Sequence, residues 1–155
     1  MDVRLIRPTD LTNYLTILER TSEQDRYHRF HHVVDAFDPA ALRRFVEDRP
    51  DMLGVIAFEN GEPLGAAHAA LIDERCAELA IVVSKDARRR GVGRALALAL
   101  VAELEARGYS RFVAHALRDN VGFTHLARSM GLHIEKADGA DATWVHETAT
   151  VAALR

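Results

Sequence analysis

The chain has 155 residues, of which 48% are hydrophobic and 28% charged, and its formal net charge is −3. These values are typical of one globular domain spanning residues 1–155, and they exclude a general nucleic-acid binder, which is normally basic. One cysteine allows no internal disulfide, and no apolar run is long enough to cross a bilayer. The sequence therefore predicts a cytoplasmic protein with neither nucleic-acid nor membrane partners.

Apolar periodicity divides the chain into the order β-α-α-β-β-β-α-β-α-β-β. Strands are expected at 3–7, 52–59, 64–73, 75–84, 111–118, 132–137 and 143–147, and helices at about 10–20, 39–48, 91–107 and 119–130. Thr9 or Asp10 is the expected cap of the first helix, and Asp38 before Pro39 that of the second. The Asn60–Gly61 pair is a strong hairpin signal, so the three strands between residues 52 and 84 are expected to form an antiparallel meander.

A strand, a helix and another strand follow one another between Ala77 and Arg118. This order predicts a parallel pair of strands connected by a crossover helix. The helix is apolar on nearly every side between Ala95 and Ala102, so we expect it to be well buried.

Three histidines, His28, His31 and His32, have the spacing of one helical face. No cysteine or carboxylate motif accompanies them, so we expect no metal site. A solvated loop, or part of a pocket for a substrate, is the expected role of this stretch.

The segment RRRGVGRA, Arg88–Ala95, lies where the fourth strand passes into the long helix. A helix start presents free N–H groups and a positive dipole end, and Gly91 and Gly93 let a phosphate approach the backbone. Arginines add positive charge around the same point, at positions 88, 89, 90 and 94 (Arg88, Arg89, Arg90 and Arg94). The pattern suits a diphosphate.

Two common phosphate motifs do not fit this segment. Walker A requires a Gly-Lys-Ser/Thr that is absent, and the Rossmann pattern has Leu96 where Gly or Ala is needed. The remaining pattern, Arg/Gln-x-x-Gly-x-Gly/Ala, is matched by Arg88, Gly91 and Gly93. This pattern resembles the coenzyme A pyrophosphate loop of GNAT acetyltransferases, and a solvated arginine turn is the alternative.

The segments AELAIVVSKDARRRGVGRAL and FVAHALRDNVGFTHLARSMGL resemble the GNAT core throughout. The segments DRYHRFHHVVDAFDPAALRRFVE and HLARSMGL are similar to the acetyltransferase domain of bacterial protein-lysine acetyltransferases. The resemblance implies an α/β GNAT fold, with a mixed sheet of about seven strands, four helices and splayed parallel central strands. It also implies direct transfer of acetyl from acetyl-CoA to an amine, either a protein lysine or a small molecule. Relatives often pair through late strands, so a homodimer is among the expected states.

The resemblance also implies which residues bind acetyl-CoA. The backbone of Ile81, Val82 and Val83 is expected to bond the pantetheine arm, with the Val82 amide polarising the thioester carbonyl. The diphosphate is expected at Arg88–Arg94, which includes Val92. Asn120 is expected to contact the cofactor or to cap the helix that follows it.

An amine acceptor has to lose a proton, since only about 0.1% of a lysine-like amine is free base at neutral pH. Glu78 is the first candidate base, because its AEL context matches the glutamate of many relatives. Strand geometry places it roughly 13 Å from Val82, so a water chain is expected. His115 is the second candidate. A glutamate paired with an arginine and a histidine satisfied within the sheet are the alternatives.

Ala127 stands where many GNAT enzymes carry a tyrosine that protonates the leaving thiolate. Either the thiolate leaves unaided or another group serves. Two other functions stay open on the sequence alone: a catalytically weak domain that senses acetyl-CoA, and a domain that binds NAD or a nucleotide through GVG.

Overall fold

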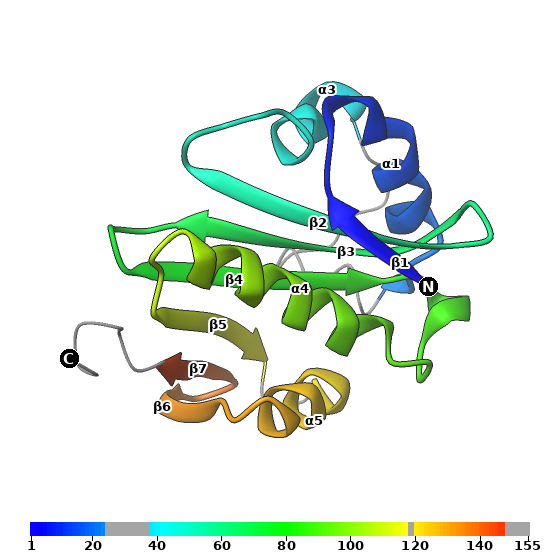
Figure 1. Ribbon diagram of the computed structural model, residues 1–155. Coiled ribbons are helices and arrows are strands. Elements are labelled where there is room, and N and C mark those ends of the chain that lie inside the picture. The colour runs from blue at the N-terminus through cyan, green and yellow to red at the C-terminus, as the bar shows by residue number, and fades with distance from the viewer. Residues whose placement is uncertain (24–37, 118–119, 148–155) are drawn as a thin grey trace.

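The computed structural model describes residues 1–23, 38–117 and 120–147. Seven strands form one mixed sheet in the order β1-β2-β3-β4-β5-β7-β6 (Figure 1). The strands are β1 (Asp2–Leu5), β2 (Met52–Glu59), β3 (Glu62–Leu71), β4 (Cys76–Val83), β5 (Arg111–Leu117), β6 (His133–Asp138) and β7 (Asp141–Glu147). The α-helices in the described ranges are α1 (Leu11–Glu19), α3 (Pro39–Leu42), α4 (Val92–Ala106) and α5 (Val121–Ser129). The expected fold class and element order are confirmed.

Strands β1 to β4 form a continuous antiparallel sheet. The expected hairpin joins β2 to β3, where Asn60 and Gly61 both have positive φ, 51° and 81°. Such a pair of left-handed residues matches the twist of the strands that it connects. The predicted meander is therefore confirmed.

Strands β4 and β5 are parallel but remain paired over only a short stretch. The register joins Cys76 to Arg111, Ala77 to Phe112 and Glu78 to Val113, and no later residues of the two strands are paired. Residues 79–83 of β4 and 114–117 of β5 therefore border an opening in the sheet, called here the β4–β5 gap. This confirms the splayed parallel pair.

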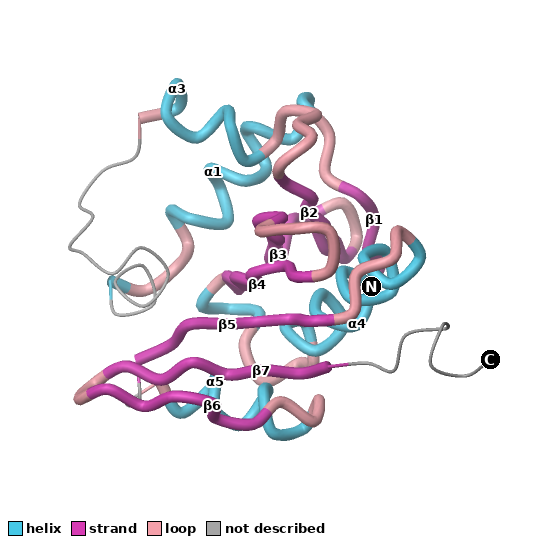
Figure 2. The backbone as a smooth tube through the Cα atoms, turned by 90° about the vertical axis from the view of Figure 1, so that its left-hand side faces the viewer, coloured by secondary structure: helices cyan, strands magenta, loops and turns pink. Residues whose placement is uncertain are grey.

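The helices cover the sheet in two groups. Helices α1 and α3 lie on one side of β1–β4, and α4 and α5 lie on the other (Figure 2). Helix α4 buries one stripe against the sheet, through Val92, Leu96, Leu100 and Leu104. Its outer side is open, since Leu98 is 49% exposed, so the helix is less well buried than expected. Within the described residues no helix combines the length and apolar character that a membrane span requires.

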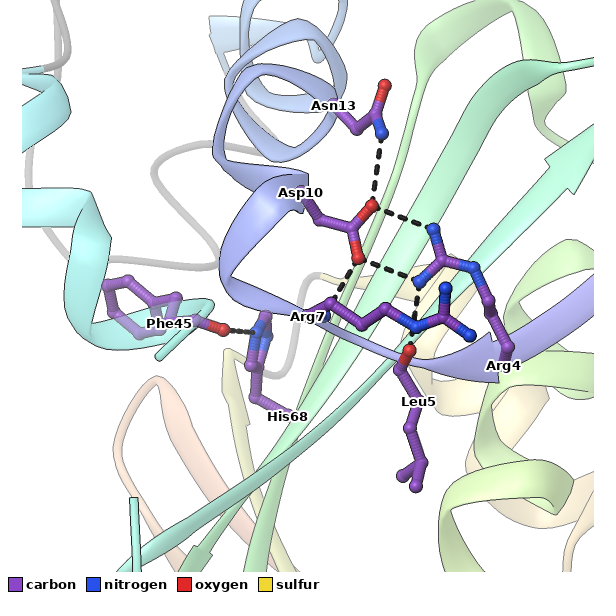
Figure 3. A network of polar contacts seen from close by, with 7 residues as sticks. All are labelled: Arg4, Leu5, Arg7, Asp10, Asn13, Phe45 and His68. Atoms are coloured by element: carbon purple, nitrogen blue, oxygen red, sulfur yellow. Dashed lines mark hydrogen bonds and ion pairs between the residues drawn. The ribbon is translucent and has the colours of Figure 1, made fainter. Parts of the chain in front are cut away.

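The second predicted helix is shorter than expected. Asp38 caps it as predicted, accepting a hydrogen bond from the Ala40 amide at 3.0 Å, but the α-helix ends at Leu42. Residues Arg43–Phe45 continue as a 3₁₀ turn. This turn brings the Phe45 carbonyl to 2.8 Å from Nε2 of the buried His68 on β3, which fixes where the segment lies on the sheet (Figure 3).

Asp10 is buried, but its side chain does not cap α1. The two terminal nitrogens of the Arg4 guanidinium donate to its carboxylate at 2.7 and 2.8 Å, and the Arg7 amide and the Asn13 side chain donate as well (Figure 3). Burial raises the pKa of this carboxyl, but these hydrogen bonds outweigh burial and the pKa lies below its usual value. Asp10 therefore links β1 to the start of α1 through Arg4 and does not serve as the expected cap.

Candidate active site

Along β4, the backbone N–H and C=O groups of successive residues point alternately toward β3 and toward the β4–β5 gap. At one end of β4 the Ser84 amide donates to Leu64 of β3, and at the other the Cys76 carbonyl accepts from Ile72. The register between them has no bulge, so even-numbered residues direct their backbone groups to β3 and odd-numbered residues direct theirs to the gap. Ile81 and Val83 therefore face the gap. The amide of Val82 faces β3, which corrects the expectation that it polarises the thioester.

The loop at the start of α4 adopts the conformation that its glycines permit. Gly91 is the residue before the helix and has φ +78°, and a Cβ added there would meet no other part of the chain within 4 Å. A left-handed backbone at this point is costly for other residues, and it leaves the helix start open to solvent. A Cβ at Gly93 would lie 3.5 Å from Leu126, an ordinary van der Waals contact, so this position faces α5 and does not itself require glycine.

The four arginines of the loop are exposed but differ in what they contact. Arg90 forms an ion pair with Glu59 at the end of β2. Arg94 donates to the Ser129 carbonyl at 3.4 Å, and Arg88 to Ser22 at the same distance. Arg89 has φ +59°, which is unusual for a residue with a side chain. The sequence predicts the positive charge of this loop, but it does not predict the ion pair between Arg90 and Glu59.

A cavity of about 480 Å³ lies between α4 and α5 beside the gap. Its volume is in the range of small-molecule sites. Its lining is mostly apolar and comes from β4, β5 and both helices, with Leu79, Ile81, Ala114, Phe123 and Leu126 near the gap and Arg94 at the first turn of α4. An apolar channel thus runs from the arginine loop to the opening in the sheet.

Glu78 and His115 meet on the opposite face of the sheet, called here the acceptor face. The Nε2 atom of His115 lies 3.9 Å from a carboxylate oxygen of Glu78, and both side chains are nearly half exposed. The other ring nitrogen, Nδ1, lies 3.2 Å from the Thr143 hydroxyl. The sequence names Glu78 and His115 as separate candidates, and the structure brings them together. Thr143 is a contact that sequence reasoning missed, because nothing local indicates that β7 pairs with β5.

Two further positions limit the chemistry. The side-chain oxygen of Asn120 accepts a hydrogen bond from the Phe123 amide at 3.0 Å, so its expected role as a cap is confirmed. Ala127 is buried against Ala114, Ala116 and Trp144, and its methyl side chain has no hydroxyl to donate a proton.

Covalent catalysis has little support in this site. Burial, reinforced by Asp73, raises the pKa of the Cys76 thiol, which disfavours the thiolate that a nucleophile needs. Cys76 also lies at the paired end of β4, away from the gap. In the described ranges no group of three or more His, Cys, Asp and Glu residues could hold a metal ion. His28, His31 and His32 lie outside those ranges, as does Arg118.

A splayed sheet beside an arginine–glycine helix start is the arrangement expected of a GNAT acetyltransferase. The sequence model of the acetyltransferase (GNAT) family matches residues 14–132. The chain belongs to this family.

Solved structures share the fold over nearly the whole chain. The GNAT domain of PAT from S. lividans is 22% identical, with 94% of this chain and 89% of that one covered and a TM-score of 0.87. The PaiA N-acetyltransferase of Thermoplasma acidophilum, solved with coenzyme A, is 16% identical, with 96% and 100% covered and a TM-score of 0.76. The ribosomal-protein-S18-alanine N-acetyltransferase of Escherichia coli is 19% identical, with 97% and 95% covered and a TM-score of 0.76. At these identities the likeness concerns the fold.

Proposed function

We propose that the protein transfers an acetyl group from acetyl-CoA directly to an amine, either a protein lysine or a small-molecule amine. The observation that carries this proposal is the β4–β5 gap, which opens next to the arginine–glycine start of α4. One site thereby offers unpaired strand backbone for an extended amide chain and a cationic helix start for a diphosphate. Acetyl-CoA contains both groups in one molecule.

The loop Arg88–Arg94 would hold the diphosphate through the first amides of α4, which include those of Val92 and Gly93, and through the nearby arginines. The pantetheine arm would lie along β4 and take up the backbone groups of Ile81 and Val83 that β5 leaves unpaired. The Ile81 amide, in place of Val82, is then the proposed donor to the thioester oxygen as charge develops on it. The side-chain NH2 of Asn120, whose oxygen caps the helix, would donate to the cofactor.

The amine would approach from the acceptor face, where Glu78 and His115 can accept its proton through water. The amine nitrogen attacks the thioester carbon, the carbon–nitrogen bond forms and the carbon–sulfur bond breaks. The proton of the amine passes to the His115–Glu78 pair, and coenzyme A leaves as a thiolate. A thiol with a pKa of about 8.5 is a tolerable leaving group without an acid, which is compatible with Ala127.

Thiol release from acetyl-CoA, measured with a panel of amines and lysine peptides, tests this function. Glu78→Gln is expected to lower kcat about 100-fold or more and to leave the Kd for acetyl-CoA unchanged, because Glu78 faces away from the cofactor channel. Glu74→Gln removes the same charge at the exposed β3–β4 turn and serves as the control. Tight binding without turnover of any acceptor would favour the sensor. A thermal shift with NAD but none with acetyl-CoA would reject the proposal.

A further inference from the structure

The cavity between α4 and α5 extends past the point where the proposed thioester would lie. A Cβ at Gly93 would lie 3.8 Å from a methyl group of Val83, so the first turn of α4 stands beside the end of β4. From there the helix runs antiparallel to β4, and two strand residues, about 6.6 Å, correspond to roughly four helix residues (Figure 1). Ile81 is therefore level with the second turn of α4, whereas the cavity continues to Glu105 in the last turn.

The part of the cavity beyond Ile81, called here the distal cavity, is long and mainly apolar. Leu98 in the second turn of α4 and Glu105 in its last turn both line the cavity, and the helix rises about 10 Å between them. An acetyl group has one methyl beyond the carbonyl carbon and is too short to fill this length. The apolar side chains around the distal cavity come from β4, α4, β5 and the segment after α5, and they are Leu79, Val101, Phe112 and Leu132.

We infer that the distal cavity holds the chain of an acyl-CoA longer than acetyl-CoA; this inference rests on the proposed function. With the thioester oxygen at the Ile81 amide and the sulfur toward the arginine loop, the acyl chain leaves the carbonyl carbon on the side away from sulfur and runs along α4. The carbonyl carbon stays at the β4–β5 gap, so the reaction is that of acetyl transfer: the carbon–nitrogen bond forms, the carbon–sulfur bond breaks, the amine gives up a proton and coenzyme A leaves as a thiolate.

The charged groups of the cavity favour a neutral chain. Glu105 lies at the far end, where the ring of His146 stacks on Phe112 with centroids 6.3 Å apart. The lining arginine, Arg94, lies at the opposite end, in the first turn of α4. A carboxylate at the end of an acyl chain would approach the like charge of Glu105, which costs free energy. The expected substrate is therefore a linear, uncharged acyl group.

Calorimetry with a series of coenzyme A thioesters tests the distal cavity without any amine present. Each methylene that leaves water should tighten binding by up to about fourfold, so hexanoyl-CoA should bind at least about tenfold more tightly than acetyl-CoA. Butanoyl-CoA should lie between them. Succinyl-CoA has the same number of acyl carbons as butanoyl-CoA and carries a terminal carboxylate, so it should bind more weakly than butanoyl-CoA. Equal affinities for acetyl-CoA and hexanoyl-CoA, or weaker binding of hexanoyl-CoA, would overturn the inference.

A pair of substitutions on α4 locates the chain. Ala102 lines the cavity and is exposed, so Ala102→Phe can place a ring over the distal cavity without entering the core. Ala106 is also exposed and does not line the cavity, which makes Ala106→Phe the control. Ala102→Phe should lower the ratio of hexanoyl-CoA to acetyl-CoA affinity at least about fivefold, and Ala106→Phe should keep it within about twofold of wild type. The acetyl-CoA affinity of each variant reports whether the coenzyme site is still folded.

The outcomes separate this inference from the proposed function. A wild-type affinity ratio in Ala102→Phe would overturn the distal cavity as the acyl site. A chain that binds hexanoyl-CoA more tightly than acetyl-CoA but acylates no amine with either would support the cavity and reject the proposed transfer. A chain that binds no coenzyme A thioester would reject both.

Discussion

The two parts of the sheet are built differently. Strands β1 to β4 are joined by four to eight residue pairs at each step, and large apolar side chains bury both of their faces. Strands β5 and β7, together with helix α5, bury a small cluster in which Trp144 is the large side chain among four alanines. Three residue pairs join the two parts.

This difference explains where the site lies. The β1–β4 part leads into the arginine–glycine loop and carries the backbone of Ile81 and Val83, whereas the β5–β7–β6 part carries His115 and Thr143. Incomplete pairing between them leaves backbone donors and acceptors beside an apolar channel, and such groups are costly unless something bonds them. A ligand with amide groups could form hydrogen bonds with these backbone groups along the β4–β5 gap.

The largest effect on stability is expected from a substitution in the small cluster around Trp144. Trp144 is 3% exposed and packs edge-on against Phe123, so Trp144→Ala should lower the free energy of unfolding by about 3–5 kcal/mol. Hydrogen exchange should show lost protection in β5 and β7 while β1–β4 stays protected. Leu98→Ala, at a half-exposed position on α4, is the control and should change stability by less than about 0.5 kcal/mol. Equal loss of protection in all strands would mean that the two parts unfold as one.

A second experiment separates backbone strain from ligand binding in the loop Arg88–Arg94, for which we propose diphosphate binding. Gly91 and Gly61 have nearly the same φ, +78° and +81°, and a Cβ at either position would have open space around it. Valine at either position should therefore cost about 1–2 kcal/mol of stability. Gly91→Val should also weaken coenzyme A binding at least about tenfold, because its side chain would stand at the helix start that we propose holds the diphosphate. Calorimetry that finds the same affinity loss in Gly61→Val would refute a local role for the loop.

The unfolding free energy of the β1–β4 part should depend on pH through Asp10. The pKa of Asp10 is lowered in the folded protein, so its contribution to stability is complete above its unfolded value, about 3.9, and is lost as pH falls through the folded value. Asp10→Asn should cost about 1–3 kcal/mol at neutral pH and flatten the dependence of unfolding free energy on pH below about 4. Denaturant titrations at several pH values measure this. Asp51, whose pKa is lowered by Arg49 at the exposed surface, provides the control in Asp51→Asn, which should have little effect.

The order of the elements follows from the sequence because the signals for it are local. Apolar spacing marks the strands, and Asn60–Gly61 and Gly91 mark points where the backbone must turn left-handed. The splayed pair came from the family resemblance, and the structure confirms it. Strand alternation also places Glu78 correctly on the face opposite Leu79 and Ile81.

What the sequence does not determine is which neighbour each strand faces. Alternation assigns side chains to faces, but the direction of the Val82 amide depends on which edge of β4 meets β3, and only the register decides that. The meeting of His115 with Glu78 and with Thr143 depends on the placement of β5 between β4 and β7. Similarly, the Asp10 side chain does not cap the helix as predicted, because it binds Arg4 from another element. Local signals thus predict elements, whereas the site arises from long-range pairing.

The smallest effect concerns Arg89, where stability and binding should change in opposite directions. Arg89 has φ +59° and an exposed side chain beside the start of α4. Arg89→Gly relieves the strained backbone and should raise stability by up to about 1 kcal/mol, less the entropy that glycine adds to the unfolded chain. The loss of a cation should weaken coenzyme A binding severalfold at low salt and less at high salt. Asn60→Gly, at φ +51°, is the matched control and should change stability alone. Unchanged affinity of Arg89→Gly at low salt would mean that the arginine serves the turn and not the ligand.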